Sequence, residues 1–361
     1  MKILLLIDNL GSGGAQRQMV TLAEIIKNEG INVEFLVYND ADFFTKKVES
    51  LNLKINKIYT NNAIYRIIKV RNFIRNGNFD VVISFMDVPN FLNCISAIGG
   101  ASWKVITSER SCNFDVFYKL KYKIYNWFQK WSNCIVCNSD NACNLWLKHY
   151  PIFKHKLKVI YNPIKLPEIT SVYKPLENGK LNIVIAASFQ EIKNPIGLIK
   201  AISLLTEEDK SRICIYWYGE NKKTKHLIYH YDYAQKLIIK YNIENQIKLL
   251  DPTDDIINIM NKADIVSLFS KYEGLPNSIL EAMMIGKPII MTKVSDFQKL
   301  IDENNGFLCQ WDNSNSIKVA LQKAINLDSD QLLKMGKYSK SKALELFSYE
   351  NIKTQWLNTI Y

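Results

Sequence analysis

Residues 263–292 carry the pattern that most constrains the fold of this chain. An apolar run from Ile265 to Phe269 leads into a polar turn, then a helix-like segment, then a second apolar run over residues 289–292. This strand–loop–helix–strand order is typical of half a parallel α/β layer. Because open α/β sheets bind ligands at the carboxyl ends of their strands, we expect a site at the turn between the first strand and the helix.

Two carboxylates stand eight residues apart at this turn. Glu273 lies in the loop after the first strand, and Glu281 lies one helical turn beyond Asn277 on the same predicted helix face. Pro276 suits the first turn of a helix, and the backbone amides at a helix start bind anions. A carboxylate one turn further can accept hydrogen bonds from two neighbouring hydroxyls, as a ribose diol offers. The spacing therefore indicates a site for a nucleotide diphosphate.

The segment EGLPNSILEAMMIGKP, residues 273–288, resembles the E-x7-E signature of glycosyltransferase family 4, whose members are retaining enzymes with the GT-B fold. The resemblance implies an α/β chain of two Rossmann-like domains whose parallel sheets face a central cleft. It also implies that Glu273 is catalytic, near the transferred sugar, and that Glu281 holds the ribose. Either glutamate alone is more typical of a solvated carboxylate, but the whole motif favours function. The donor-binding residues that the motif implies are Glu273, Gly274, Leu275, Pro276, Asn277, Ser278 and Glu281.

The first glycine-rich loop resembles another element of the same family. Residues 11–17, GSGGAQR, are similar to its GGAER-like loop, which implies that Gly13 and Gly14 keep the backbone close to the donor or acceptor. The dinucleotide pattern G-x-G-x-x-G fails here, because Gln16 stands at the position of the third glycine. A dinucleotide oxidoreductase is therefore disfavoured.

The loop after the strand predicted at residues 181–187 resembles the GRLxxxKN loop that grips the donor diphosphate. Ser188 stands where that loop has its arginine, and Lys193 matches its lysine. We expect Ser188 to line the donor site, and Lys193 to bind the donor and to act in catalysis, because a lysine supplies a point charge to phosphates. Lys193, the helix start and the glycine loop can stabilise the leaving diphosphate without a metal. No D-x-D element offers a credible metal site, so we predict no metal and no other cofactor.

Residues 108–111, Ser-Glu-Arg-Ser, follow a strand predicted at residues 105–107. They resemble the SER element of family members that extend polyprenyl-linked or lipopolysaccharide sugars. The resemblance implies that Glu109 is a catalytic candidate and that Arg110 contacts the acceptor. An ion pair or a helix cap at the end of a strand is an equally good interpretation.

Residues 114–131 combine apolar residues at helical spacing with lysines, and predict one surface helix. The net charge of +11 lies mainly in residues 1–165, which hold 22 Lys and Arg against 12 Asp and Glu, whereas residues 166–361 hold 24 against 23. No nucleic-acid motif accompanies this charge, and lysines among aromatic residues suit a lipid headgroup region. We expect peripheral binding to the inner-membrane surface; the alternative is a helix packed on the sheet. The residues assigned to the acceptor or the membrane are Arg110, Lys119, Lys123, Trp127 and Phe128.

The domain prediction follows the order of these elements. Residues 1–165 form an N-terminal acceptor domain, 166–180 a linker with two prolines, and 181–348 a donor domain, while a helix at about 349–361 packs back on the first domain. Cys134 and Cys137 form C-x-x-C in a strand-like run, so they are expected to be core residues on opposite faces. His226 and His230 are expected to be surface histidines, because the pattern of a zinc protease is missing.

The expected compartment is the cytoplasm, on the cytosolic face of the membrane. The seven cysteines show no disulfide framework, the apolar run near the N-terminus is too short for a signal peptide, and no run approaches the length of a spanning helix. The predicted activity is transfer of a hexose or N-acetylhexosamine, with retention, from a UDP-sugar to a lipid-linked saccharide during O-antigen, capsule or lipopolysaccharide synthesis. The alternatives are a GT-B sugar-nucleotide 2-epimerase and a non-enzymatic basic lipid-binding protein, which leaves the E-x7-E motif unexplained.

Overall fold

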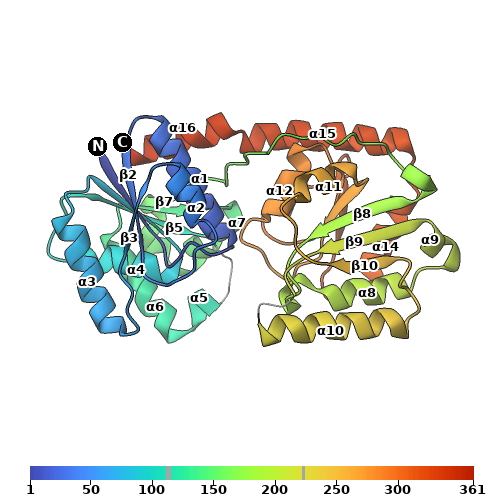
Figure 1. Cartoon of the computed structure of the whole chain (residues 1–361), viewed down its shortest axis with the longest axis horizontal. Coiled ribbons are helices and arrows are strands. Elements are labelled where there is room, and N and C mark those ends of the chain that lie inside the picture. Colours follow the sequence, from blue (N-terminus) through green and yellow to red (C-terminus); the bar gives the residue numbers. More distant parts are fainter. Residues whose placement is uncertain (111–114, 222–223) are drawn as a thin grey trace. The chain divides into compact units, whose positions relative to one another are not determined.

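The computed structural model describes residues 1–110, 115–221 and 224–361 (Figure 1). The chain divides into two compact units: Met1–Pro163 together with Tyr349–Tyr361, and Ile164–Ser348. Each unit is a parallel sheet covered by helices, which confirms the prediction of two Rossmann-like α/β domains. Ser111, part of the predicted Ser-Glu-Arg-Ser element, and Phe114, the start of the predicted surface helix, lie outside the described residues.

The first unit contains a seven-stranded sheet in the order β3-β2-β1-β4-β5-β6-β7. Every pair of neighbouring strands is parallel, and the chain reverses its direction of travel across the sheet between β3 and β4. The strands are β1 (Lys2–Leu6), β2 (Asn32–Val37), β3 (Lys54–Lys57), β4 (Val81–Phe85), β5 (Lys104–Glu109), β6 (Cys134–Cys137) and β7 (Leu157–Val159). The helices are α1 (Gly14–Asn28), α2 (Thr45–Ser50), α3 (Ala63–Asn76), α4 (Asp87–Ser96), α5 (Asp115–Tyr118), α6 (Leu120–Trp127), α7 (Asp140–His149) and α16 (Tyr349–Ile360), with 3-10 turns η1 (Phe128–Trp131) and η2 (Pro151–Lys156).

The central strands of this sheet, such as β1 and β4, are buried on both faces, which is why they read as continuous apolar runs. Ile3 and Leu5 pack in the core that contains α1 and Trp356 of α16, whereas Leu4 and Leu6 pack in the core that contains α3 and α4. The C-terminal helix thus belongs to the core of the first unit. In the same way the two cysteines of β6 are buried in different cores, on opposite faces of the sheet, as predicted.

The second unit contains a six-stranded parallel sheet in the order β10-β9-β8-β11-β12-β13. One face packs on α8, α10 and α14, and α11 and α12 contact the strands from the other face (Figure 1). The strands are β8 (Leu181–Ala186), β9 (Ile213–Tyr218), β10 (Ile247–Leu250), β11 (Ile265–Leu268), β12 (Ile289–Thr292) and β13 (Gly306–Cys309). The helices are α8 (Pro195–Ser203), α9 (Glu207–Ser211), α10 (Lys225–Lys240), α11 (Ile256–Lys262), α12 (Asn277–Met284), α13 (Phe297–Leu300), α14 (Ser314–Ile325) and α15 (Ser329–Phe347), with 3-10 turns η3 (Glu177–Gly179) and η4 (Glu191–Lys193).

The single surface helix predicted for residues 114–131 is wrong. The segment forms α5, α6 and η1, with extended backbone at Lys119 between the two helices. The break has a packing reason, because Phe117 and Phe128 pack into different cores. The Phe128 ring contacts the Phe91 ring edge to face, with 4.9 Å between the ring centroids. One straight helix would not direct both rings into separate cores.

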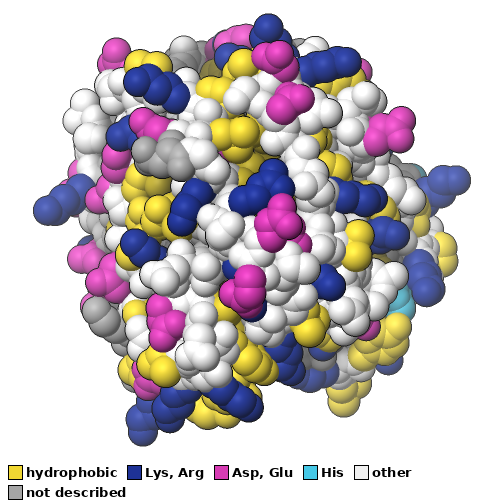
Figure 2. All heavy atoms as spheres, turned by 90° about the vertical axis from the view of Figure 1, so that its right-hand side faces the viewer, with side chains coloured by type: hydrophobic (Ala, Val, Ile, Leu, Met, Phe, Trp, Pro, Cys, Tyr) yellow, Lys and Arg dark blue, Asp and Glu magenta, His cyan; other side chains and the backbone are white. Residues whose placement is uncertain are grey.

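One face of the molecule carries charges of both signs (Figure 2). Figure 2 shows a face on which Lys and Arg side chains alternate with Asp and Glu, with hydrophobic side chains scattered between them. This mixture contrasts with a single-sign electrostatic field. No helix among the described residues combines the length and hydrophobicity needed to cross a bilayer.

Candidate functional site

Two loops of the second unit bring a lysine and a glutamate together. Lys193 closes η4 in the loop after β8, and Glu273 lies in the loop after β11, the neighbouring strand. The Lys193 Nζ lies 2.5 Å from Glu273 Oε1, and Ser270 Oγ donates to the same oxygen at 2.6 Å. The sequence assigned Lys193 and Glu273 to separate motifs; the parallel sheet joins them because the carboxyl ends of adjacent strands share one edge.

Backbone hydrogen bonds fix the two loops against each other. The amide of Lys271 donates to the carbonyl of Ile192 at 2.7 Å, which ties the loop after β11 to η4. Ser295 Oγ donates to the carbonyl of Gly274 at 2.5 Å, which ties the same loop to the segment after β12. The side chains of Lys193 and Glu273 remain 19% and 13% exposed, so the pair is enclosed but open to a ligand.

Helix α12 begins beside this pair. Pro276 is the N-cap and α12 starts at Asn277, so the proline precedes the first turn instead of lying within it. The first amides that bond inside the helix are those of Ile279 and Leu280, which donate to the Pro276 carbonyl at 3.0 and 3.1 Å. Helix geometry directs the amides before them out of the helix start, toward the position of an anion.

The second carboxylate of the motif is buried. Glu281 is only 4% exposed on α12, which excludes the interpretation of this residue as a solvated surface carboxylate. Leu275 and Pro276 are also buried, whereas Gly274, Asn277 and Ser278 are half-buried at the helix start. A buried carboxylate requires hydrogen-bond partners, since an unpaired buried charge is costly.

Ser188 lies in the same loop as Lys193. Its side chain is half-buried directly after β8, and its carbonyl accepts a hydrogen bond from the amide of Gln190 at 2.8 Å. Gly219, at the end of the adjacent β9, has no room for a side chain, because a Cβ there would lie 2.0 Å from the carbonyl oxygen of Ala187. The loop after β8 is therefore held tightly where the family has its arginine.

The glycine loop of the first unit is filled by its own chain. Gln16 is buried and donates from Nε2 to Asp8 Oδ1 at 3.1 Å, and burial raises the pKa of Asp8. A Cβ on Gly13 would lie 2.1 Å from Gln16 Oε1, so the Gln16 side chain would have to move away from Asp8 to admit one. Gly13 caps α1 and Gly14 is its first residue, which places both at the start of a 15-residue helix.

Glu109 ends β5 with its carboxyl group inside the first unit. It is 4% exposed and accepts a hydrogen bond from Asn90 Nδ2 at 2.9 Å. Burial, with the nearby Asp87 carboxyl, raises the pKa of Glu109 to about 8, although the Asn90 hydrogen bond and Arg110 act in the opposite direction. The shift favours the neutral, protonated form of this carboxyl group.

Arg110 packs back against the first unit. Its guanidinium lies 3.8 Å from the centroid of the Phe85 ring and 5.7 Å from that of Trp356 in α16, and its Nη1 donates to Asn162 Oδ1 at 2.7 Å. Burial lowers the pKa of Arg110. These contacts favour the structural interpretation of this residue over contact with an acceptor.

Asp87 and Ser270 were not among the site residues predicted from the sequence, although each lies beside one of them. Asp87 begins α4 at the carboxyl end of β4, and burial raises its pKa. The residue before it, Met86, has φ of 77°, an unfavourable backbone conformation for a side chain of this kind. The polar residues directly after an apolar strand were the available signal for Asp87, whereas the Ser270 contact depends on a loop conformation that no pattern encodes.

The residues assigned to the membrane lie on one short segment. Lys119, Lys123 and Trp127 are exposed, as are Leu120 at 74% and Ile124 at 49%. Phe128 instead packs partly into the core beside α4. The exposed side chains form a basic and apolar patch, which we call the α6 patch: Tyr118, Lys119, Leu120, Lys121, Lys123, Ile124, Trp127 and Lys130.

The prediction of two surface histidines on α10 is half wrong. His226 is exposed, but His230 is 9% exposed and lies under its neighbours. The i, i+4 spacing placed both rings on one face of the helix, and it carries no information about what packs over that face.

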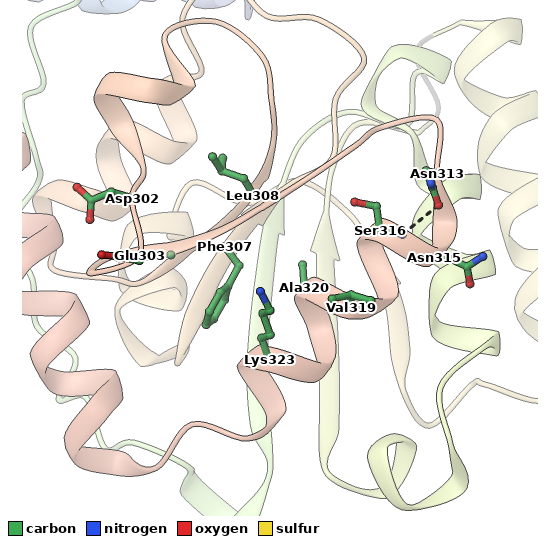
Figure 3. Close-up of a pocket in the computed structure, with 11 residues that line it drawn as sticks. Asp302, Glu303, Phe307, Leu308, Asn313, Asn315, Ser316, Val319, Ala320 and Lys323 are labelled. Atoms are coloured by element: carbon green, nitrogen blue, oxygen red, sulfur yellow. Dashed lines mark hydrogen bonds between the residues drawn. The ribbon is translucent and has the colours of Figure 1, made fainter.

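A separate pocket of about 560 Å³ opens between β13 and α14 in the second unit. Figure 3 shows Phe307 and Lys323 beside it, with Asp302 and Glu303 at one end and Asn313 at the other. It shares no residue with the predicted donor site.

Family models match both units. The model described as Glycosyltransferase Family 4 matches residues 12–167, and the model described as Glycosyl transferases group 1 matches residues 170–342. Together they span nearly the whole chain. The match confirms the family that the E-x7-E segment indicated.

Two bacterial relatives align along most of their length. One is the Campylobacter jejuni GalNAc-alpha-(1->4)-GalNAc-alpha-(1->3)-diNAcBac-PP-undecaprenol alpha-1,4-N-acetyl-D-galactosaminyltransferase, at 25% identity over 100% of this chain and 98% of the relative. The other is the Escherichia coli UDP-Gal:alpha-D-GlcNAc-diphosphoundecaprenol alpha-1,3-galactosyltransferase, at 21% identity over 93% and 90%. A similar solved structure is that of Anabaena Alr3699/HepE in complex with UDP, with a TM-score of 0.87 at 17% identity over 100% of this chain and 99% of that one. At that identity the likeness establishes the fold.

Proposed function

Because this chain belongs to the glycosyltransferases, with a family 4 domain followed by a group 1 domain, we propose that it transfers a sugar from a UDP-sugar to a lipid-linked saccharide with retention of configuration. The names of the Campylobacter and Escherichia relatives describe transfer to saccharides on diphospho-undecaprenol. The Anabaena neighbour binds UDP. By the same analogy the transferred sugar is a hexose or an N-acetylhexosamine, and the product belongs to a cell-surface polysaccharide such as O-antigen or capsule.

The observation that carries this proposal is the Lys193–Glu273 pair beside the start of α12. A nucleotide diphosphate brings negative charge, which the Lys193 ammonium and the amides at the helix start both attract. Glu281, one turn further on α12, accepts hydrogen bonds from the ribose hydroxyls. Gly274, Leu275 and the loop of Ser188 supply the backbone around the diphosphate.

Donor binding would rearrange the ion pair. The diphosphate competes with Glu273 for Lys193, so Lys193 turns to the phosphates and Glu273 is released to the sugar. In the transfer step the bond from C1 to the diphosphate oxygen breaks, and a bond from C1 to the acceptor oxygen forms on the same face. The acceptor hydroxyl then lies beside the departing diphosphate, which takes its proton. Lys193 stabilises the charge that grows on this leaving group, and a metal ion is not required.

In the first unit we propose different roles for the predicted residues. Gly13 and Gly14 present the N-terminal amides of α1, while Glu109 acts by positioning Asn90 and the end of β5. The α6 patch binds the anionic surface of the membrane that holds the lipid-linked acceptor. Lys130, whose Nζ lies 3.4 Å from the Trp127 ring centroid, illustrates the mixture of cation and aromatic ring that suits this surface.

The proposal is tested by incubating the purified protein with a panel of UDP- and GDP-sugars, a polyprenyl diphosphate saccharide and EDTA. We expect the acceptor to gain the mass of one sugar with a UDP-sugar. Hydrolysis or isomerisation of the donor, with the acceptor unchanged across the panel, would favour an epimerase or another class of acceptor. Donor-independent binding to lipid, with no product, would favour a lipid-binding protein.

A further inference from the structure

A cluster of two histidines and one glutamate lies in the second unit, among residues that the transfer reaction does not use. His226 and His230 lie on successive turns of α10, and Glu191 begins η4. Their ligand atoms all lie within 4.8 Å of one another, and the two imidazole centroids are 4.4 Å apart. In the part of the chain that the structure describes, these three residues form the one group of His, Cys, Asp or Glu close enough to share an ion.

The donor atoms of this cluster suit a late first-row divalent metal. Two imidazole nitrogens and one carboxylate oxygen are common ligands of Zn²⁺, which binds each at about 2.0–2.2 Å and holds tetrahedral ligands about 3.4 Å apart. The longest of the present separations, which reach up to 4.8 Å, therefore has to shorten by up to about 1.4 Å. His226 and Glu191 are exposed and can change rotamer, whereas His230 is held by burial.

The charge of the cluster also fits a divalent cation. The Glu191 carboxylate neutralises one of the two positive charges of the ion. The cluster therefore binds a divalent cation more favourably than the two histidines would alone.

We propose that Glu191, His226 and His230 bind one Zn²⁺ ion, with water in the fourth position. The ion joins η4 to the first turns of α10, two elements from different parts of the second unit. It has a structural role, since η4 is the turn that also holds Lys193, and its Ile192 carbonyl is bonded to the amide of Lys271. The metal site rests on its own geometry and does not depend on the proposed transfer reaction.

The test uses full-length protein without a polyhistidine tag, stripped with EDTA and then dialysed free of the chelator. Zn²⁺ is titrated in competition with a chromophoric chelator. We expect one ion per chain and at least a tenfold loss of affinity in His226→Ala and in Glu191→Gln. His226 and Glu191 are exposed, so these variants should fold normally. His155→Ala is the matched control, because His155 is an exposed histidine of the first unit, and it should bind as the wild type does.

Thermal unfolding supplies a second readout that does not involve activity. At a free Zn²⁺ concentration of about 100 times the dissociation constant, the midpoint of the wild type should rise by about 5 °C or more, and that of His226→Ala should not. Absence of a stoichiometric ion in the wild type would overturn the proposal. Equal Zn²⁺ affinity in wild type and His226→Ala would also overturn it, since the ion would then lie elsewhere, for example on cysteine thiols.

Discussion

Replacing Lys193 by alanine separates the catalytic role of the Lys193–Glu273 pair from its structural role. If Lys193 stabilises the leaving diphosphate, its removal should cost about 2 to 4 kcal/mol of transition-state stabilisation, which lowers kcat/KM by about 30- to 1000-fold. The assay is sugar transfer to a polyprenyl diphosphate saccharide at several donor concentrations, so that kcat and KM are resolved.

The effect on stability should be smaller. Exposed ion pairs contribute up to about 1 kcal/mol, and breaking a fully buried pair costs about 3 to 5 kcal/mol. With side chains 19% and 13% exposed, and with Ser270 still bonded to Glu273, we expect Lys193→Ala to lower the free energy of unfolding by about 1 to 2 kcal/mol. A protein of ordinary stability remains folded after this loss, so the rate measures the folded enzyme.

Two controls make the comparison decisive. Lys271→Ala removes a neighbouring exposed lysine but keeps the backbone bond to Ile192, so its rate and stability should stay close to wild type. A double-mutant cycle with Glu273→Gln should give a coupling of about 1 kcal/mol in the free energy of unfolding. If Lys193→Ala loses stability while its turnover stays within a few-fold of wild type, the pair is structural only and our assignment of Lys193 is refuted.

Three further perturbations test other parts of the account. Glu281→Ala should weaken binding of UDP by about tenfold in calorimetry, because two ribose hydrogen bonds are lost, and unchanged affinity would rule out the ribose role. Folding raises the pKa of Glu109, so the folded state binds the proton of this carboxyl group more tightly than the unfolded state does. The contribution of Glu109 to the free energy of unfolding is therefore complete below about pH 4.5 and declines as the pH rises toward about 8. Denaturant unfolding from pH 5 to 8 should therefore show a fall of up to about 1 kcal/mol per pH unit that Glu109→Gln reduces, and parallel curves for the two proteins would contradict this. Replacing Leu120 and Trp127 by alanine should reduce co-sedimentation of the protein with anionic vesicles several-fold. Neutral vesicles should bind both the wild type and the variant weakly. If the variant binds anionic vesicles as well as the wild type does, the α6 patch is not the membrane contact.

The sheets and the main motif were predictable because their signals are local. The apolar runs at Ile265–Phe269 and Ile289–Thr292 match β11 and β12 to within one residue, since a strand buried on both faces reads as a continuous hydrophobic segment. The start of α12 was predicted within one residue, because Pro276 fixes where a helix can begin.

The failures concern contacts between segments that are distant in sequence. Helical spacing in residues 114–131 suggested one helix, but Phe117 and Phe128 belong to different cores, which only the folded chain reveals. The Lys193–Glu273 bond joins residues 80 positions apart, and it depends on β8 and β11 being neighbours in the sheet. His230 is buried for the same reason: a helical pattern shows which residues share a face, but not what covers that face.

The measurement that tests the central claim most directly is the anomeric configuration of the transferred sugar, read from the proton coupling between C1 and C2 of the product. With an α-linked UDP-sugar as donor, and EDTA present, the account predicts an axial α-linkage to the saccharide acceptor. A β-linked product would show inversion, and would contradict attack on the face of the departing diphosphate beside Lys193 and Glu273.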